Sequence, residues 1–175
     1  MKQQQLLSYL RRAVNDYKMI DEGDKIAVGV SGGKDSLALL TLMHAFSKFS
    51  DKHFELCGIT VDMGFSPDAY APVQEYCDKL GIPYKIVKTD IAQIIFDVRK
   101  EKNPCSLCAK MRRGALNGEI KAMGFNKLAL GHHLDDVVET FMLSLFYEGR
   151  LNTFQPKSFM SRSEVTRIRP MIYIP

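Results

Sequence analysis

A glycine-rich turn between two apolar segments restricts the fold more than any other feature of this chain. The turn is Ser31–Ser36, with the sequence SGGKDS. The segment before it, 25–30, has the pattern of a buried strand, and the segment after it, 37–43, is compatible with a helix. Adjacent glycines let the backbone approach a ligand closely, and the free N–H groups of a helix's first turn favour an anion. The unit therefore predicts a phosphate-binding turn.

Strand and helix patterns alternate along the rest of the chain. The strand patterns fall at 25–30, 54–61, 84–88 and 127–130. The helix patterns fall at 5–20, 35–47, 68–80, 91–98, 104–124 and from 134 onward. Alternation of this kind is typical of an α/β fold in which helices cover both faces of a mostly parallel sheet.

Three polar segments follow predicted strands. They are 31–36, 62–64 and 131–136. Ligands bind at the carboxyl ends of strands in such sheets, so we expect these segments to converge in space. The helix after the third segment has apolar residues at 134, 137, 138, 141, 142, 145 and 146, which predicts a stripe that faces the core.

Charge is unevenly distributed in this chain of net charge +4. Residues 99–113 hold six Lys or Arg and one Glu, and residues 150–175 hold five and one. Two basic segments on an otherwise acidic chain indicate a polyanionic partner such as RNA, although a solvated surface explains them equally well. No apolar run reaches the roughly 20 residues of a membrane helix, and no signal peptide is present, so we expect a cytoplasmic protein without membrane contact.

Three segments describe the predicted organisation. They are an N-terminal helix and turn (1–22), a nucleotide-binding domain (23–150) and a basic C-terminal segment (151–175). Periodicity weakens after Gly149, and the sequence stops at Ile174-Pro175 within a pattern. We therefore expect a truncated C-terminal segment.

The turn at 31–36 does not match the mononucleotide P-loop, because Val28 and Asp35 occupy the positions of its first glycine and its Ser/Thr. SGGKDS instead resembles the pyrophosphate loop of the PP-loop ATP pyrophosphatases, which have an adenine nucleotide α-hydrolase-like fold and cleave ATP between the α and β phosphates. The resemblance implies a three-layer α/β/α domain. It also implies ATP contacts by Val30, Ser31, Gly32, Gly33, Lys34, Asp35, Ser36, Asp62, Met63, Gly131 and His132.

A second motif, GHHLDDVVET at 131–140, resembles that of the tRNA-modifying branch of this superfamily. The branch includes the tRNA 2-thiocytidine synthetases and the tRNA-isoleucine lysidine synthetases. Carboxylates are ordinary Mg²⁺ ligands, and the resemblance assigns Mg²⁺ to Asp35, Asp135 and Asp136. Carboxylates at a helix start are also favourable for dipole reasons alone.

The cysteine pair in PCSLC distinguishes between these two families. Cys105 and Cys108 resemble a pair that the 2-thiocytidine synthetases have and the lysidine synthetases lack. That family implies a [4Fe-4S] cluster on three cysteines, and the third has no counterpart in this chain. From the residues alone, zinc, a disulfide redox couple or a persulfide relay also suit the pair. We expect Cys57 and Cys77 to be buried structural residues.

The resemblance implies ATP-dependent thiolation of a tRNA cytidine. ATP adenylates the C2 oxygen, pyrophosphate leaves, and sulfur displaces AMP; Lys34, Asp35, Cys105 and Cys108 are the expected catalytic residues. The expected partners are tRNA, a sulfur donor such as a cysteine desulfurase, and a second copy in a homodimer. Residues expected to hold tRNA phosphates are Arg99, Lys100, Lys102, Lys110, Arg112, Arg113, Arg150 and Lys157.

Two other functions remain open from the sequence. One is another PP-loop enzyme that adenylates a different base or uses a different nucleophile, as a lysidine synthetase does. The other is a non-catalytic ATP-binding or redox module, which the short C-terminal segment favours.

Overall fold

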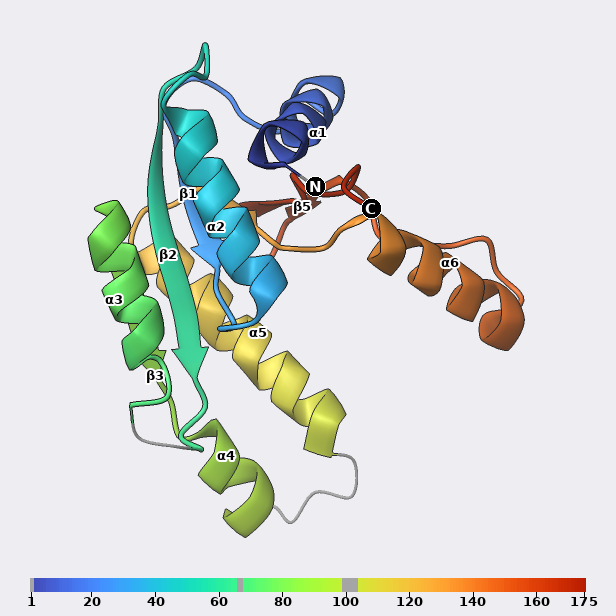
Figure 1. Cartoon of the computed structure of the whole chain (residues 1–175). Coiled ribbons are helices and arrows are strands. Elements are labelled where there is room, and N and C mark those ends of the chain that lie inside the picture. Colours follow the sequence, from blue (N-terminus) through green and yellow to red (C-terminus); the bar gives the residue numbers. More distant parts are fainter. Residues whose placement is uncertain (1, 66–67, 99–103) are drawn as a thin grey trace.

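A six-stranded sheet forms the centre of the computed structural model, which describes residues 2–65, 68–98 and 104–175 (Figure 1). Its strands lie in the order β3-β2-β1-β4-β6-β5, and all neighbours are parallel except β5 and β6. The bounds are β1 Asp24–Gly29, β2 Phe54–Asp62, β3 Tyr84–Lys88, β4 Lys127–Ala129, β5 Lys157–Met160 and β6 Val165–Ile168. The predicted α/β class with a mostly parallel sheet is confirmed.

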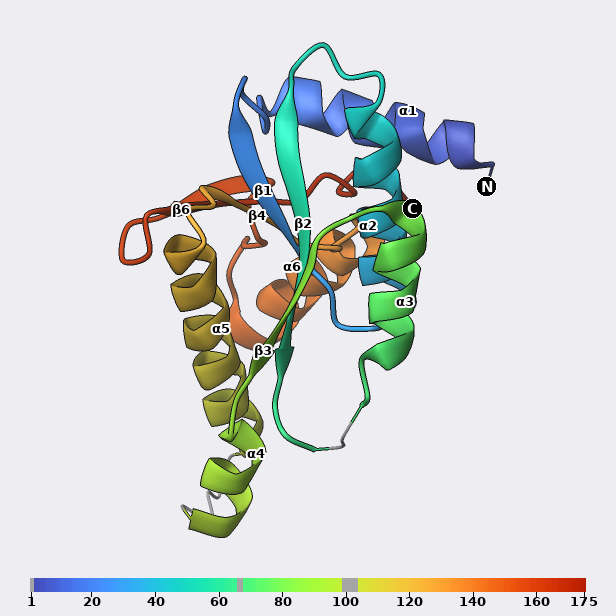
Figure 2. The same cartoon turned by 90° about the vertical axis from the view of Figure 1, so that its left-hand side faces the viewer.

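Helices cover both faces of the sheet, as Figure 2 shows for α5 on one side and α2 and α3 on the other. Their bounds are α1 Gln3–Asp16, α2 Lys34–Ser47, α3 Ala71–Leu80, α4 Ile91–Gln93, α5 Pro104–Ala122 and α6 Leu134–Glu148. A π-helical turn, η1 Ile94–Val98, continues α4. No helix in the described ranges has both the length and the apolar character that crossing a membrane requires.

Alternating residues of the strands build the two halves of the core. On β1, Ile26 and Val28 pack in the cluster that includes residues of α1, α2 and α3. Ala27 points to the other face, where it joins Ile59 of β2 and Ile120 of α5. This alternation holds the carboxyl end of β1, and with it the glycine-rich turn, between two helical layers.

The hairpin of β5 and β6 was not predicted. β6 lies parallel to β4, with Leu128 opposite Arg167, and Ile168 is fully buried in the core. The strands are short, and their partners are distant in sequence, so local periodicity carries little signal for them. Residues 157–160 and 165–168 therefore belong to the same sheet as β1 to β4.

Helix α6 corrects one expectation. Its apolar periodicity predicted a stripe buried in the core, yet Val138 is 52% exposed and Phe146 is 72% exposed. Ser144 is the one residue of α6 that is buried, and Val137 packs against the core from the first turn. The helix leaves the sheet at that turn and points away from it, so its apolar side chains have no layer to pack against (Figure 1).

A buried ion pair ties β4 to the first residue of β1. Lys127 Nζ lies 2.5 Å from Asp24 Oδ2, and both side chains are only 5% exposed. The same ammonium donates to the Met19 carbonyl at 2.9 Å. Lys127 also pairs with Asp21 at 2.8 Å, whereas no second cation pairs with Asp24 among the described residues. Removal of Lys127 therefore leaves the Asp24 carboxylate buried and uncompensated, a situation that costs more than the pair contributes.

Lys127→Met should therefore lower the free energy of unfolding by about 3–5 kcal/mol, measured by urea denaturation. Lys121→Met is the matched control, since the Lys121–Glu164 pair is 57% and 67% exposed. The control should lose no more than about 1 kcal/mol. Equal losses in the two variants would contradict this assignment.

Candidate active site

The glycine-rich turn has the geometry of an anion cradle. Gly32 has φ +86°, a left-handed conformation that favours glycine. The Ser31 amide donates to Ser36 Oγ at 3.1 Å, and that hydroxyl donates to the Gly33 carbonyl at 2.8 Å. Gly33 is the N-cap of α2 and supplies no side-chain cap, so the N–H groups of the first turn remain available to a ligand.

The loop after β4 lies against this turn at Gly131. A Cβ at Gly131 would stand 3.0 Å from the Asp35 carbonyl oxygen and 3.3 Å from the Ser36 nitrogen. These contacts are with backbone atoms, which have little room to move. The two sequence motifs therefore converge, as predicted, and a residue without a side chain allows the close approach.

A pocket of about 600 Å³ opens at this junction. It joins four parts of the chain: the glycine-rich turn, the loop after β4, one face of α5, and β6. Its lining residues are Gly29, Ser31, Asp35, Ser36, Ala109, Arg112, Arg113, Leu116, Leu128, Leu130, Gly131, His132, Asp136, Arg167 and Arg169. Ser31, Asp35, Ser36, Gly131 and His132 are therefore brought together as predicted for one site.

The other predicted ATP contacts are not among the residues that line the pocket. Gly32, Gly33 and Lys34 belong to the same turn and are exposed. Val30 is buried beneath it, and its carbonyl accepts a hydrogen bond from Thr60 Oγ1 at 2.5 Å. At the end of β2, Asp62 accepts from the Gly64 amide at 2.9 Å, and Met63 lies beside Cys108.

His132 stands in a half-buried position between an aromatic ring and a cation. Its ring centroid is 4.8 Å from that of Phe154, and its Nδ1 atom is buried without a hydrogen-bond partner among the described residues. Burial lowers the pKa of His132, and the nearby Arg169 guanidinium lowers it further. The neutral imidazole is therefore favoured at neutral pH.

NMR titration should place the pKa of His132 below its ordinary 6.5. Arg169→Gln should raise that pKa, because the charge of Arg169 is removed while burial remains. Because the pKa is lower in the folded state, the unfolded chain binds the proton more tightly. The contribution of His132 to the free energy of unfolding is therefore lost as the pH falls below 6.5. A His132 pKa at or above the ordinary value would contradict the assignment.

Two of the three carboxylates predicted to hold Mg²⁺ lie at the pocket. Asp35 and Asp136 line the pocket, and Asp135 is not among its lining residues. Asp136 Oδ2 accepts from the His133 amide at 2.8 Å, which fixes the start of α6. In the described part of the chain, no three His, Cys, Asp or Glu side chains gather as a metal cage. Mg²⁺ usually needs only one or two carboxylates beside substrate phosphates and water, so Asp35 and Asp136 fit that mode of binding.

The cysteine pair lies in the first turn of α5. Cys105 is exposed, and Cys108 is half-buried with its Sγ 3.4 Å from Met63 Sδ. Ala109 and Arg112, one turn further along the same helix, line the pocket. A rise of 1.5 Å per residue places Cys105 and Arg112 about 10 Å apart along the helix axis. The pair thus stands at the end of a helix that forms one wall of the pocket.

The remaining cysteines are buried, as expected. Cys57 is 2% exposed and Cys77 is inaccessible, and burial raises the pKa of the Cys77 thiol to about 11. They are unsuited to ligate a metal beside Cys105 and Cys108. The four cysteines of the chain therefore offer two ligands for a cluster and no complete set.

The residues predicted to hold tRNA phosphates lie in different parts of the structure. Arg112 and Arg113 line the pocket. Lys110 and Arg150 are exposed, and Lys157 donates to the Lys18 carbonyl. The three others, Arg99, Lys100 and Lys102, lie outside the described residues.

Two pocket arginines were missed as site residues. Arg167 and Arg169 lie at the end of β6, and Arg169 is only 4% exposed. The basic composition of 150–175 indicated an anion-binding segment. Because β6 was not predicted, the sequence did not show that these two side chains reach the pocket. Their place on a strand two positions from β1 brings them there.

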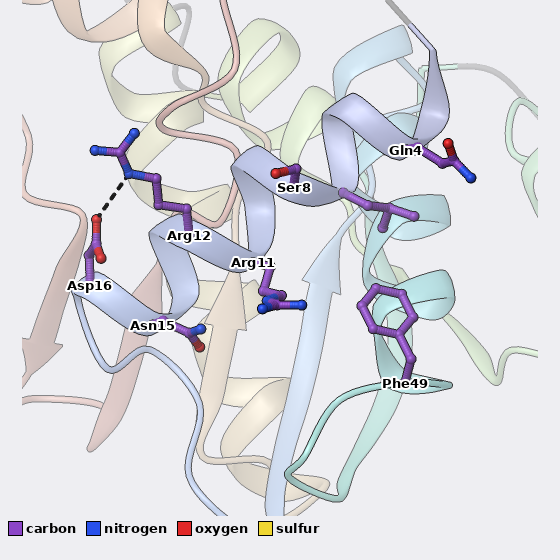
Figure 3. Close-up of a pocket in the computed structure, with 8 residues that line it drawn as sticks. Gln4, Ser8, Arg11, Arg12, Asn15, Asp16 and Phe49 are labelled. Carbon is purple, nitrogen blue, oxygen red and sulfur yellow. Dashed lines mark ion pairs between the residues drawn. The ribbon is translucent and has the colours of Figure 1, made fainter.

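A second cleft, of about 520 Å³, lies between α1 and the segment after α2 (Figure 3). Arg11 and Asn15 of α1 and Phe49 are among its lining residues. Arg12, on the same helix, pairs with Asp16 at 3.6 Å. None of the predicted site residues lines this cleft, which is at the opposite end of α2 from the glycine-rich turn.

Known proteins resemble the chain over nearly its whole length. The tRNA-cytidine(32) 2-sulfurtransferase of Alkalilimnicola ehrlichii is 44% identical over 98% of this chain and 55% of its own length. That of Dichelobacter nodosus is 39% identical over 99% of this chain and 67% of its own length. The chain thus spans about half to two-thirds of these relatives.

A solved structure shows the same arrangement. The U34-tRNA thiolase NcsA from Methanococcus maripaludis, solved with its [4Fe-4S] cluster, superposes with a TM-score of 0.78 at 29% identity. The match covers 98% of this chain and 59% of that one. The sequence pattern of the PP-loop domain family matches residues 3–175. The chain belongs to the PP-loop domain family.

Proposed function

We propose that this chain provides the ATP-activating core of a tRNA base thiolase that acts on cytidine. The observation that carries the proposal is the shared pocket, where the glycine-rich turn faces the helix that bears Cys105 and Cys108. An anion cradle in the pocket and a pair of thiols at the start of the helix that forms its wall suit activation by ATP followed by attack of sulfur. The similarity to tRNA-cytidine(32) 2-sulfurtransferases supports cytidine as the base.

ATP activation follows from the donors around the turn. The N–H groups at the start of α2, with Ser31 and Ser36, would hold the pyrophosphate portion of ATP, and Lys34 would neutralise charge as it leaves. The cytidine C2 oxygen attacks the α phosphorus, and the bond from that phosphorus to the bridging oxygen breaks. Pyrophosphate leaves, and AMP stays on the base.

Mg²⁺ is assigned to Asp35 and Asp136, with Asp135 as a neighbour that acts through water. When bound, the ion supplies charge neutralisation at the phosphates. The two pocket carboxylates hold and orient it beside the turn. His132, whose pKa is lowered by burial, would contact the nucleotide as a neutral ring.

Sulfur transfer is assigned to the pair on α5. In a persulfide relay, the outer sulfur on one cysteine attacks C2, a carbon–sulfur bond forms, the carbon–oxygen bond breaks and AMP leaves. The thiol of the other cysteine then attacks the carrier sulfur, so that the sulfur–sulfur bond breaks, the thiolated base is released and a Cys105–Cys108 disulfide forms. In the alternative with a [4Fe-4S] cluster, these two thiolates would be ligands, a further ligand would come from outside the four cysteines, and the cluster would supply the sulfur nucleophile. A sulfur donor such as a cysteine desulfurase, and a homodimer, rest on the family resemblance alone.

Mass analysis of nucleosides tests this function. The chain is incubated with ATP, Mg²⁺, unmodified tRNA and a sulfide or persulfide donor, and the digested tRNA is examined for 2-thiocytidine. Replacement of oxygen by sulfur supports thiolation. Addition of an amine would instead indicate a lysidine synthetase-like enzyme, and ATP binding without any tRNA product would indicate the non-catalytic module.

A further inference from the structure

Three arginines line one side of the pocket without acidic partners. Arg113 of α5, Arg167 of β6 and Arg169, which directly follows β6, all border the cavity. Within the described ranges, none of them forms an ion pair with a carboxylate. Buried charges are ordinarily paired, so an arginine group of this kind is electrostatically incomplete.

Arg169 shows this most clearly. It is 96% buried, its guanidinium carbon lies 4.5 Å from the centroid of Phe154, and one Nη donates to the Gln155 carbonyl. Its Nε is buried with no hydrogen-bond partner among the described residues, and the same holds for the Nε of Arg167. The stacking on Phe154 holds the guanidinium plane in place, while donors remain for a ligand.

The positive charges of these three arginines are close enough to repel one another. Burial and, secondarily, the charge of Arg167 together lower the pKa of Arg169 to about 10. Arg113 acts in the same direction on the pKa of Arg167. An anion placed between these side chains would offset both the burial of the charges and their mutual repulsion. The paired N–H donors of a guanidinium match the oxygens of a phosphate.

This arginine group is separated from the glycine-rich turn. β6 and β1 flank β4, so two strand spacings of about 4.8 Å place β6 about 10 Å from the strand that leads into the turn. The turn has its own donors for the phosphates of ATP. A target base whose oxygen reaches the α phosphate brings its flanking phosphodiester into the same pocket.

We propose that Arg167 and Arg169 form a second phosphate subsite, which holds a phosphodiester of the RNA strand beside the target nucleotide. This inference rests on the proposed function. Arg113, which is exposed at the pocket edge, extends the subsite toward solvent. The subsite orients the RNA strand and has no part in the bonds that form or break.

Fluorescence anisotropy with a labelled anticodon stem-loop RNA tests the subsite. Arg167→Gln is the primary variant, because Arg167 is only half-buried. Its affinity should fall about tenfold, and the slope of log affinity against log salt should decrease by about one, as expected for one lost phosphate contact. Arg167→Lys should restore the slope, because it keeps the charge. Arg169→Gln, checked by its melting temperature, should behave as Arg167→Gln does.

Arg11→Gln is the matched control, since Arg11 lies at the second cleft (Figure 3). It should leave RNA affinity and slope unchanged, and all variants should bind ATP and inorganic pyrophosphate as the wild type does. An unchanged slope in Arg167→Gln, or an equal loss in Arg11→Gln, would overturn the subsite. Weaker pyrophosphate binding in Arg167→Gln would assign the arginines to ATP and overturn it too. Failure of the wild type to bind RNA would instead overturn the proposed function.

Discussion

Gly131→Ala should reduce tRNA-dependent pyrophosphate release by about a hundredfold in kcat/KM. The new methyl group would stand 3.0 Å from the Asp35 carbonyl oxygen and 3.1 Å from its carbon. Gly131 does not have a positive φ, so alanine suits its backbone and the effect comes from contact alone. The start of α2 must move to relieve it, and displacement of Asp35 and Ser36 disturbs both the phosphate cradle and the assigned Mg²⁺ position.

Gly118→Ala is the matched control for this substitution. Gly118 lies within α5, and a Cβ there would meet nothing within 4 Å. The control should keep its activity and gain about 0.5–1 kcal/mol of stability from helix propensity. Wild-type rates in Gly131→Ala would show that the two motifs do not need this close approach.

Cys105→Ser and Cys108→Ser should each abolish sulfur incorporation, by roughly a thousandfold or more, while pyrophosphate release stays within about threefold of the wild type. Sulfur nucleophilicity is lost in each variant, and the phosphate cradle at the far end of the pocket wall is untouched. Thiolation is followed by nucleoside mass analysis, and adenylation by pyrophosphate release in the same reaction.

Ser106→Ala controls for changes to the same helical turn. Ser106 is exposed between the two cysteines, and its replacement should leave both steps intact. Sulfur incorporation that survives in both cysteine variants would remove the pair from the mechanism. Parallel loss of pyrophosphate release and thiolation would show that the cysteines support folding or ATP binding instead.

Sequence patterns were sufficient for the parts of the fold that local residues determine. The turn at 31–36 links β1 to the first residues of α2, because the apolar strand pattern ends before it and glycine can adopt the positive φ of Gly32. Gly131 and its motif converge on that turn because parallel strands end at the same edge. These two features are local, and their contact follows from topology.

The remaining parts depend on contacts that local sequence does not encode. β6 is four residues long and gains its place by pairing with β4 across a long sequence interval. Without that pairing, Arg167 and Arg169 are simply two charges in a basic segment. The prediction of a buried stripe on α6 was wrong for a different reason. Periodicity shows that a helix is amphipathic, but it does not show which element covers its apolar face.

The products of ATP test the central claim most directly. The chain is incubated with ATP labelled at the α phosphate, Mg²⁺ and a sulfide or persulfide donor, with and without unmodified tRNA. The labelled nucleotides are separated, and pyrophosphate is measured in the same reactions. We predict AMP and an equal amount of pyrophosphate, formed only when tRNA is present. Formation of ADP and inorganic phosphate, or of AMP at the same rate without tRNA, would contradict activation of a tRNA base at this pocket.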